Sequence, residues 1–233
     1  MSIFAIGDLH LSFHEEVNKP MEVFGPRWKS HVKRLEKAWR DLISGEDTII
    51  LAGDISWGLK LKEAIPDLEW IDAMPGRKVV VKGNHDLWWK GITKLNQMYE
   101  SITFLQNDCC LAEDYFICGS RGWICPGDRD FTAADEKIFN REILRLERSI
   151  LAAKNRKDNK IIMVTHFPPT NDRLQSSLMT EMFEKAGVWK AIYGHLHGEE
   201  AFGKGLKGVR GGVEYQLVSL DYLNCIPLRI TED

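Results

Sequence analysis

Five short apolar runs constrain the fold of this 233-residue chain more than any other feature. They are rich in β-branched residues and do not alternate with polar ones. The runs are Ile3–Ile6, Thr48–Ala52, Lys78–Val81, Ile161–Thr165 and Ala191–Tyr193. Continuous runs of this kind are typical of strands that are covered on both faces. The sequence therefore predicts sheets that lie between other layers of structure.

Helical patterns separate several of these runs. One apolar stripe at helical spacing consists of Trp28, Val32, Leu35, Trp39 and Leu42. Pro66 is expected to open a second helix that continues toward Met74, because proline favours the first turn of a helix. A third helix is predicted roughly from Ala133 to Asn155.

Shorter strand-like pieces occur in two patches, in residues 103–118 and 216–229. Strands that alternate with helices, together with two such patches, predict an α/β fold with two stacked sheets flanked by helices.

Composition narrows the class of protein. The net charge of -3 gives no general attraction to nucleic acid or to an anionic membrane. The apolar runs are far shorter than the roughly 20 residues that span a bilayer. The chain begins directly with a predicted strand, and its five cysteines form no C-x-x-C pair. We therefore expect one cytoplasmic domain over residues 1–233, with reduced thiols and no membrane partner.

A short polar motif follows each apolar run. The motifs are Gly7-Asp8-Leu9-His10, Gly53-Asp54, Gly83-Asn84-His85-Asp86, Thr165-His166 and Gly194-His195-Leu196-His197. Ligands of open α/β sheets bind at the carboxyl ends of the strands, so these distant side chains are expected to meet at one edge. The glycines let the backbone turn sharply there.

The residue types in the motifs suit two metal ions. Aspartate, asparagine and histidine supply ligands for divalent ions such as Mn, Fe or Zn. The lack of thiolates and of an all-oxygen cage argues against a structural zinc site and against a calcium site. Two such ions can clamp a phosphoryl group and activate a bridging hydroxide, with one carboxylate in contact with both.

Each motif alone has a simpler explanation. Asp8-x-His10 and Gly53-Asp54 can be turns at strand ends, and His166, which precedes two prolines, can be an ordinary core histidine. What favours a metal centre is the ordered set of five motifs, each placed after a predicted strand.

This ordered set resembles the calcineurin-like metallophosphoesterase superfamily, whose signature is D-x-H, G-D, G-N-H-[DE], a single histidine and G-H-x-H. The match spans residues 8–197 and keeps every block in order. The resemblance implies an α/β protein with a four-layer α/β/β/α sandwich, two mixed β-sheets and a dinuclear metal site. It also implies an enzyme that hydrolyses phosphoester bonds.

The resemblance further implies seven metal ligands that form two groups joined by a bridging carboxylate. The first ion would be held by Asp8, His10 and His197, the second by Asn84, His166 and His195, and both by Asp54.

Two more residues of the third motif would act on the substrate. By the resemblance, His85 would face the phosphate, stabilise charge in the transition state and protonate the leaving group. Asp86 would orient the imidazole of His85, as a carboxylate often does for a working histidine.

Three residues near the motifs are candidates for further substrate contacts. Trp88 directly follows the third motif, and Arg121 and Trp123 lie in a turn-rich stretch. An aromatic face can stack on a base, and an arginine can hold a second pair of phosphate oxygens. Each tryptophan can equally well belong to the core.

The leading hypothesis is a metal-dependent phosphohydrolase that acts on a small phosphodiester or phosphomonoester. A nuclease or a nucleotide pyrophosphatase of the same superfamily is an alternative, although a nuclease needs a basic track that this slightly acidic chain lacks. A non-catalytic interaction module with the same fold is a further alternative, and the presence of His85 with all seven ligands disfavours it. Metal identity, natural substrate and oligomeric state stay open.

Overall fold

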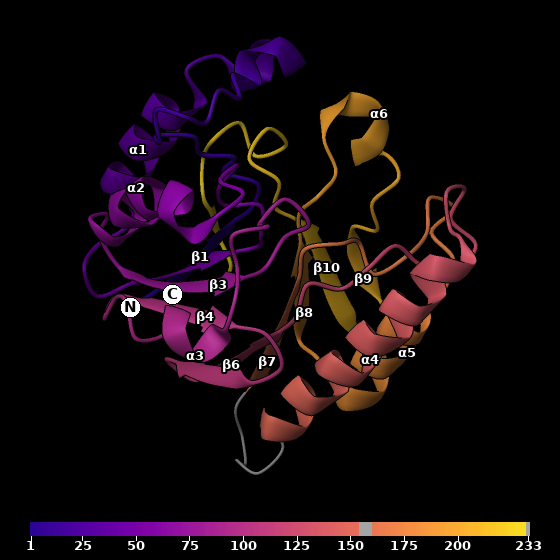
Figure 1. Ribbon diagram of the computed structural model, residues 1–233. Helices are drawn as coiled ribbons and strands as arrows, with labels where there is room; N and C mark the ends of the chain where they lie inside the picture. The colour runs from indigo at the N-terminus through magenta and orange to yellow at the C-terminus, as the bar shows by residue number, and fades with distance from the viewer. Residues whose placement is uncertain (154–159, 232–233) are drawn as a thin grey trace.

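Two β-sheets stack on each other in the computed structural model of the chain, which describes residues 1–153 and 160–231 (Figure 1). The first sheet has the order β11-β1-β2-β3-β4, formed by Leu228–Arg229, Ile3–Ile6, Thr48–Leu51, Arg77–Val81 and Ile102–Leu105. The second has the order β5-β6-β7-β8-β10-β9, formed by Cys109–Ala112, Tyr115–Gly119, Lys160–Thr165, Lys190–Tyr193, Val213–Leu217 and Gly208–Arg210.

Both sheets are mixed, with parallel strands in the centre. Strands β1 to β4 are parallel, and β11 runs antiparallel to β1 at the edge. In the second sheet β6, β7, β8 and β10 are parallel, whereas β5 and β9 are antiparallel edges. The five apolar runs therefore become neighbouring parallel strands, whose carboxyl ends lie along a common rim.

The core between the sheets explains why the runs are continuously apolar. Ile3 and Ala5 of β1 point into this layer, where they join Ile162 and Val164 of β7. The alternate residues of β1 are buried too, because they pack under the helices on the outer face. A strand buried on both faces needs no polar positions.

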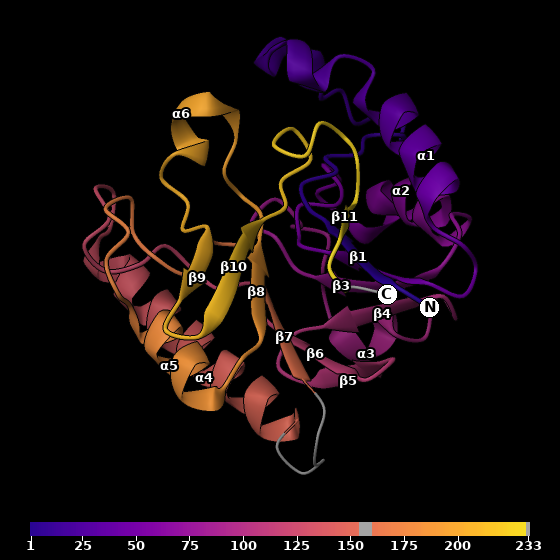
Figure 2. The ribbon, with the colours of Figure 1, turned by 180° about the vertical axis from the view of Figure 1, so that it is seen from behind.

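Helices cover the outer face of each sheet (Figures 1 and 2). The first sheet packs against α1 (His31–Leu42), α2 (Leu61–Asp72) and α3 (Ile92–Leu95). The second packs against α4 (Ala133–Ala153) and α5 (Leu178–Ala186), while the short α6 (Gly198–Phe202) stands at the rim. This order of layers confirms the predicted α/β sandwich with two mixed sheets. Among the described helices, none has the length and apolarity to cross a bilayer.

Two helix starts differ from the sequence-based expectation. Trp28 ends a 3-10 turn, η2 (Pro26–Trp28), which follows another, η1 (Met21–Phe24), and only then does α1 begin. Helix α2 begins upstream of Pro66, because the carboxylate of Glu63 accepts hydrogen bonds from the free N–H groups of Leu59 and Lys60. That cap fixes the start of the helix and leaves Pro66 inside it. The expected end of the third helix at Asn155 lies outside the described residues.

Candidate metal centre

The polar motifs gather at the rim where the carboxyl ends of the parallel strands meet. The first sheet supplies Asp8 and His10 after β1, Asp54 after β2 and Asn84 after β3, and the second supplies His166 after β7 and His195 and His197 after β8. Neither sheet holds a complete set of ligands, so the stacking of the two sheets creates the site.

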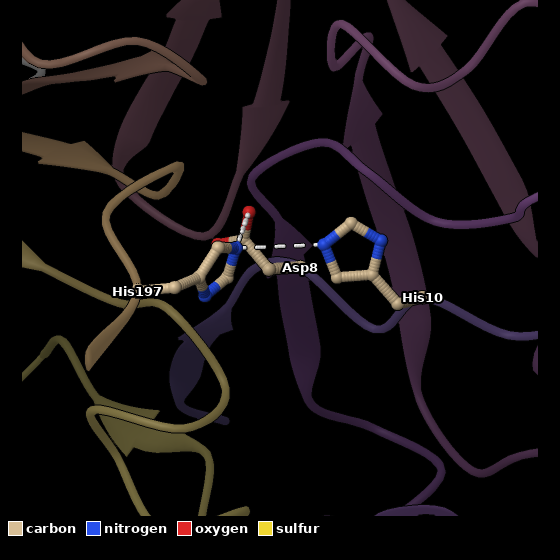
Figure 3. Close-up of side chains that lie close together, drawn as sticks. All are labelled: Asp8, His10 and His197. Atoms are coloured by element: carbon tan, nitrogen blue, oxygen red, sulfur yellow. Dashed lines mark hydrogen bonds and ion pairs between the residues drawn. The ribbon is translucent and has the colours of Figure 1, made fainter. Parts of the chain in front are cut away.

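The first group of ligand atoms consists of Asp8, His10 and His197 (Figure 3). The Nε2 atom of His197 lies 3.4 Å from Oδ1 of Asp8 and 3.4 Å from Nε2 of His10. Ligands that bind one ion at about 2.1 Å are separated by about 3.0 to 3.4 Å. The three side chains thus have the spacing of a coordination sphere.

The second group consists of Asn84, His166 and His195. The Oδ1 atom of Asn84 lies 2.7 Å from Nε2 of His166 and 3.0 Å from Nδ1 of His195. The two imidazole nitrogens are 3.3 Å apart. These three donors also converge on one point, and they are the three that the family resemblance assigns to one ion.

Asp54 joins the two groups. Its Oδ2 atom lies 3.8 Å from Nε2 of His10 in the first group and 3.4 Å from Nε2 of His166 in the second. Asp8 adds a further carboxylate, because it forms a compact cluster with Asp54 and His166. The position of Asp54 between two ligand groups is the one that a bridging carboxylate needs.

The two imidazoles of the first group have opposite pKa shifts. Burial lowers the pKa of His10 to about 4. Burial acts against a charge on His197 as well, but the carboxylates of Asp8 and Asp221 outweigh it and raise the pKa of His197 to about 10. At pH 7 the ring of His10 is therefore neutral, and the ring of His197 is doubly protonated and positively charged.

The second group repeats this arrangement. Burial, together with the charge of His166, lowers the pKa of His195 to about 3. Against burial, the carboxylates of Asp54 and Asp8 raise the pKa of His166 to about 9. Each group thus holds one additional proton, on His197 in the first group and on His166 in the second. Without it, the ligand atoms of the group would repel one another. A divalent cation in that place would supply the same neutralisation, so the donor set fits one ion in each group.

Strained backbone holds the ligands in place. Four site residues have positive φ angles, 60° at Asp8, 47° at His10, 52° at Asp54 and 72° at His195. Such conformations are unfavourable for residues with a Cβ atom and tend to occur at functional sites. Gly83 permits the close packing, because a Cβ atom there would collide with the carboxylate and the backbone nitrogen of Asp54.

His85 lies beside the ligand groups. Its side chain is 44% exposed, and its Nε2 atom is 4.0 Å from Oδ2 of Asp54. The ring opens onto a cavity of about 280 Å³ lined by His10, Met21, Phe24, Trp28, Trp57, His85, His197, Gly198 and Asp221. This placement leaves the imidazole free to contact a group that enters the cavity.

The position of Asp86 corrects one prediction. Its buried carboxylate accepts hydrogen bonds from the backbone N–H groups of Asp54, Ile55, Ser56 and Gly83 and from Nε1 of Trp88, at 2.7 to 3.3 Å. None of the described hydrogen bonds joins Asp86 to His85. The carboxylate instead ties the loop of the second motif to the loop of the third, because it satisfies donors from both.

The three candidates for substrate contacts lie away from this cavity. Trp88 is completely buried and packs against Phe104, so it belongs to the core and not to a substrate pocket. The guanidinium of Arg121 lies 4.3 Å from the ring centre of Trp123. Arg121 lines a different cavity, and Trp123 donates a hydrogen bond to Asp135 at the start of α4.

Two residues of the site were not predicted from the sequence. Asp221 accepts a hydrogen bond from Nδ1 of His197 at 2.9 Å, which turns the Nε2 atom of that ring toward Asp8. Trp57 stacks on His10 at 4.7 Å between ring centres and lies 4.5 Å from the ring of His85. Asp221 follows β10, a parallel neighbour of β8, so its place after a strand was an available signal; the stacking of Trp57 was not visible in the sequence.

Comparisons with known proteins agree with this geometry. A family described as calcineurin-like phosphoesterase matches residues 1–199. The "Gene 66 protein" of Mycobacterium phage L5 is 43% identical over 58 residues, 25% of this chain and 28% of the phage protein. The protein of the same name from phage D29 is 28% identical over 104 residues, 43% of this chain and 50% of its own length. The chain thus spans half or less of these relatives.

Solved structures share the fold. A protein of unknown function from Aquifex aeolicus superposes with a TM-score of 0.52 at 18% identity, covering 98% of this chain and 95% of its own. A protein of Thermus thermophilus gives a TM-score of 0.56 at 13% identity, covering 84% of this chain and 82% of its own. At such identities the likeness concerns the fold alone.

Proposed function

Because the chain belongs to the calcineurin-like phosphoesterase family, we propose that it hydrolyses a small phosphodiester or phosphomonoester with the help of two divalent cations. The observation that carries this proposal is the convergence of seven donor side chains in two groups joined by Asp54. The cations would be Mn, Fe or Zn, since the donors are imidazoles and hard oxygens.

The ligands would divide between the cations as their spacing indicates. Asp8, His10 and His197 would hold one, Asn84, His166 and His195 the other, and Asp54 both. When bound, the two ions supply an activated water molecule and neutralise charge on the phosphoryl group.

The protein fixes the tautomers of two ligand rings. Nδ1 of His166 lies 3.0 Å from the backbone oxygen of Ala52, and Nδ1 of His197 lies 2.9 Å from Asp221. With Nδ1 donating in each ring, Nε2 faces the ligand group, and its lone pair becomes available when the ring loses its second proton. Both rings are therefore aimed before any ion arrives.

His85 is the residue that would act on the phosphoryl group directly. It is the exposed imidazole at the edge of the ligand groups, and its backbone N–H donates to Oδ1 of Asp54 at 2.8 Å. The bond fixes the position of His85 relative to the carboxylate that joins both groups. From there the ring can donate a hydrogen bond to a phosphoryl oxygen and a proton to the leaving oxygen.

The walls of the adjoining cavity favour a substrate with an apolar or aromatic group next to the phosphate. Trp28 and Trp57 flank His10, and Met21 extends the apolar surface. The volume of about 280 Å³ suits a small molecule. No lysine or arginine lines this cavity in the part of the chain that the structure describes, which disfavours a nuclease.

Hydrolysis of two chromogenic esters tests the proposal. Purified protein loaded with Mn²⁺ is expected to cleave bis-p-nitrophenyl phosphate, p-nitrophenyl phosphate or both. The ratio of the two rates separates a diesterase from a monoesterase. Lack of activity toward both esters with Mn, Fe, Co, Ni and Zn would contradict a phosphoesterase function.

A further inference from the structure

A second cavity lies on the same rim, beside the metal centre. Its volume is about 290 Å³, and its walls include Lys82, Trp89, Arg121, Arg141 and Arg145. Lys82 follows β3 and Arg121 follows β6, while both other arginines come from α4. We call these five residues and the space between them the basic cavity.

The basic cavity has more cations than partners. One carboxylate, that of Glu142, serves all three arginines, with Oε1 2.6 Å from Arg145, 3.7 Å from Arg121 and 4.0 Å from Arg141. Its other oxygen accepts a hydrogen bond from Ser120 at 2.7 Å. Among the described ion pairs none involves Lys82. Glu142 is thus the one carboxylate in the described ion pairs of these four cations, and Asp86 acts on Lys82 only from a longer distance.

Two hydrogen-bond donors on the cavity wall also lack partners. Trp89 is 5% exposed, and its Nε1 atom is buried with no hydrogen bond in the described structure. The Nε atom of Arg121 is buried and unpartnered as well. Buried donors without acceptors are unfavourable, so an acceptor placed next to either group would be stabilising.

The cations on the cavity wall suit an acceptor with several oxygens and more than one negative charge. Guanidinium groups form paired hydrogen bonds with phosphate oxygens, and a lysine adds a mobile positive charge. A carboxylate would offer only two oxygens to these donors. We propose that the basic cavity binds a phosphoryl dianion at a site separate from the metal centre.

The phosphoryl group can belong to a free anion or to a second phosphate of the substrate. The two sites share their loops, because Lys82 and the ligand Asn84 lie on one loop and the backbone oxygen of Arg121 accepts a hydrogen bond from the N–H of His166 at 2.9 Å. A molecule with two phosphates could therefore reach both. Binding of a second substrate phosphate rests on the proposed function, whereas binding of a free anion does not.

Titration with inorganic phosphate tests the proposal on the full chain after metal removal with a chelator. Without ions, phosphate cannot be held through a bound cation at the metal centre, so the part of the calorimetric signal that depends on Arg141 and Arg145 reports on the basic cavity. Arg145→Gln and Arg141→Gln are each expected to weaken binding roughly ten- to hundredfold. Arg148→Gln is the matched control, because Arg148 is exposed on the same helix and does not line the cavity.

The outcomes are distinct. Equal affinity in Arg148→Gln, Arg141→Gln and Arg145→Gln would overturn the proposal, and so would an absence of phosphate binding by the unaltered chain. Arg141 has a more exposed side chain than Arg145, so its replacement disturbs the fold less and serves if Arg145→Gln fails to fold. Because the titration needs no catalysis, its failure is separable from a failure of the proposed hydrolysis.

A second titration, on the metal-loaded protein, identifies the source of the phosphoryl group. If it belongs to the substrate, fructose 1,6-bisphosphate will bind more tightly than fructose 6-phosphate, and Arg145→Gln will remove the difference. If it belongs to a free anion, the two sugars will bind alike while inorganic phosphate still requires Arg145.

Discussion

The metal centre and the basic cavity are neighbours on one rim with opposite chemistry. The metal centre collects atoms with lone pairs, such as Oδ2 of Asp54 and Nε2 of His166, 3.4 Å apart. The basic cavity collects donors, with three arginines around Glu142. The donor atoms of the first region suit cations, and the hydrogen-bond donors of the second suit an anion. One edge of a fold can therefore carry separate sites for cations and for a phosphate.

The regions also differ in how the chain builds them. The candidate metal ligands lie on tight loops directly after strands, where Asp8 and His195 adopt strained backbone conformations. Two of the four cations of the basic cavity, Arg141 and Arg145, come from a regular helix and lie one turn apart. Loop motifs can be recognised in the sequence. The role of charged residues on a helix can be inferred only once the packing of the helix against the rim is known.

Replacement of Asp54 should abolish metal binding without affecting the basic cavity. Asp54→Ala removes the carboxylate between both ligand groups, so we expect loss of both ions and a fall of hydrolysis to background. Metal content by mass spectrometry and hydrolysis of p-nitrophenyl esters measure the two effects. Asp41→Ala, at an exposed position of α1, is the control. Full metal content in Asp54→Ala would refute the bridging role.

Replacement of His85 separates chemistry from metal binding. Because its exposed ring lies outside the ligand groups, His85→Ala should lower kcat roughly 10²- to 10⁴-fold with unchanged metal content. Steady-state kinetics and metal analysis on the same sample measure both quantities. A variant that loses its ions would show that His85 is a ligand, contrary to the assignment made above.

Metal affinity should depend steeply on pH. In the metal-free chain the carboxylates around His166 raise its pKa to about 9, and those around His197 raise its pKa to about 10, so both rings carry a proton at pH 7. Each ring must lose that proton to bind an ion, which means that a higher pH favours binding and a lower pH opposes it. We expect about a hundredfold gain in affinity per ion between pH 6 and pH 8.

Competition titrations with a metal indicator at several pH values measure this slope. Phosphate binding at the basic cavity should instead follow the ionisation of phosphate to its dianion, because no imidazole is among the described residues that line the cavity. A metal affinity that is flat over this range would contradict the protonated state of the two rings.

Replacement of Asp221 should weaken the binding of one metal ion and not of the other. Asp221→Asn removes the charge that orients His197, so the affinity for the ion of the first group should fall roughly 10- to 100-fold. The ion held by Asn84, His166 and His195 should be unaffected. Calorimetric titration that resolves two binding steps tests this difference, and an equal weakening of both steps would contradict the division into two groups.

The sequence was sufficient to predict the sheets because their strands are buried on both faces. The run Ile3–Ile6 has no polar position and Ile161–Thr165 has one only at its end, and the structure places both in the centre of the sandwich. Helix starts were harder. Pro66 was expected to open α2, but the cap formed by Glu63 sets the boundary.

The convergence of the short motifs at the rim could be predicted from the sequence, whereas contacts that depend on packing could not. Asp86 belongs to a motif, yet its partners are backbone N–H groups of a loop far away in the sequence. Trp88 was a candidate for substrate binding, but the core buries it completely. Trp57 and Arg145 reach their cavities only because distant segments fold over them.

Anomalous diffraction from crystals loaded with Mn²⁺ would locate the ions themselves. Two ions are expected, each about 2.0 to 2.3 Å from its ligand atoms. One should contact His10 and His197, the other Asn84 and His195, and Asp54 should contact both. A single ion, or ions bound elsewhere on the chain, would contradict this arrangement.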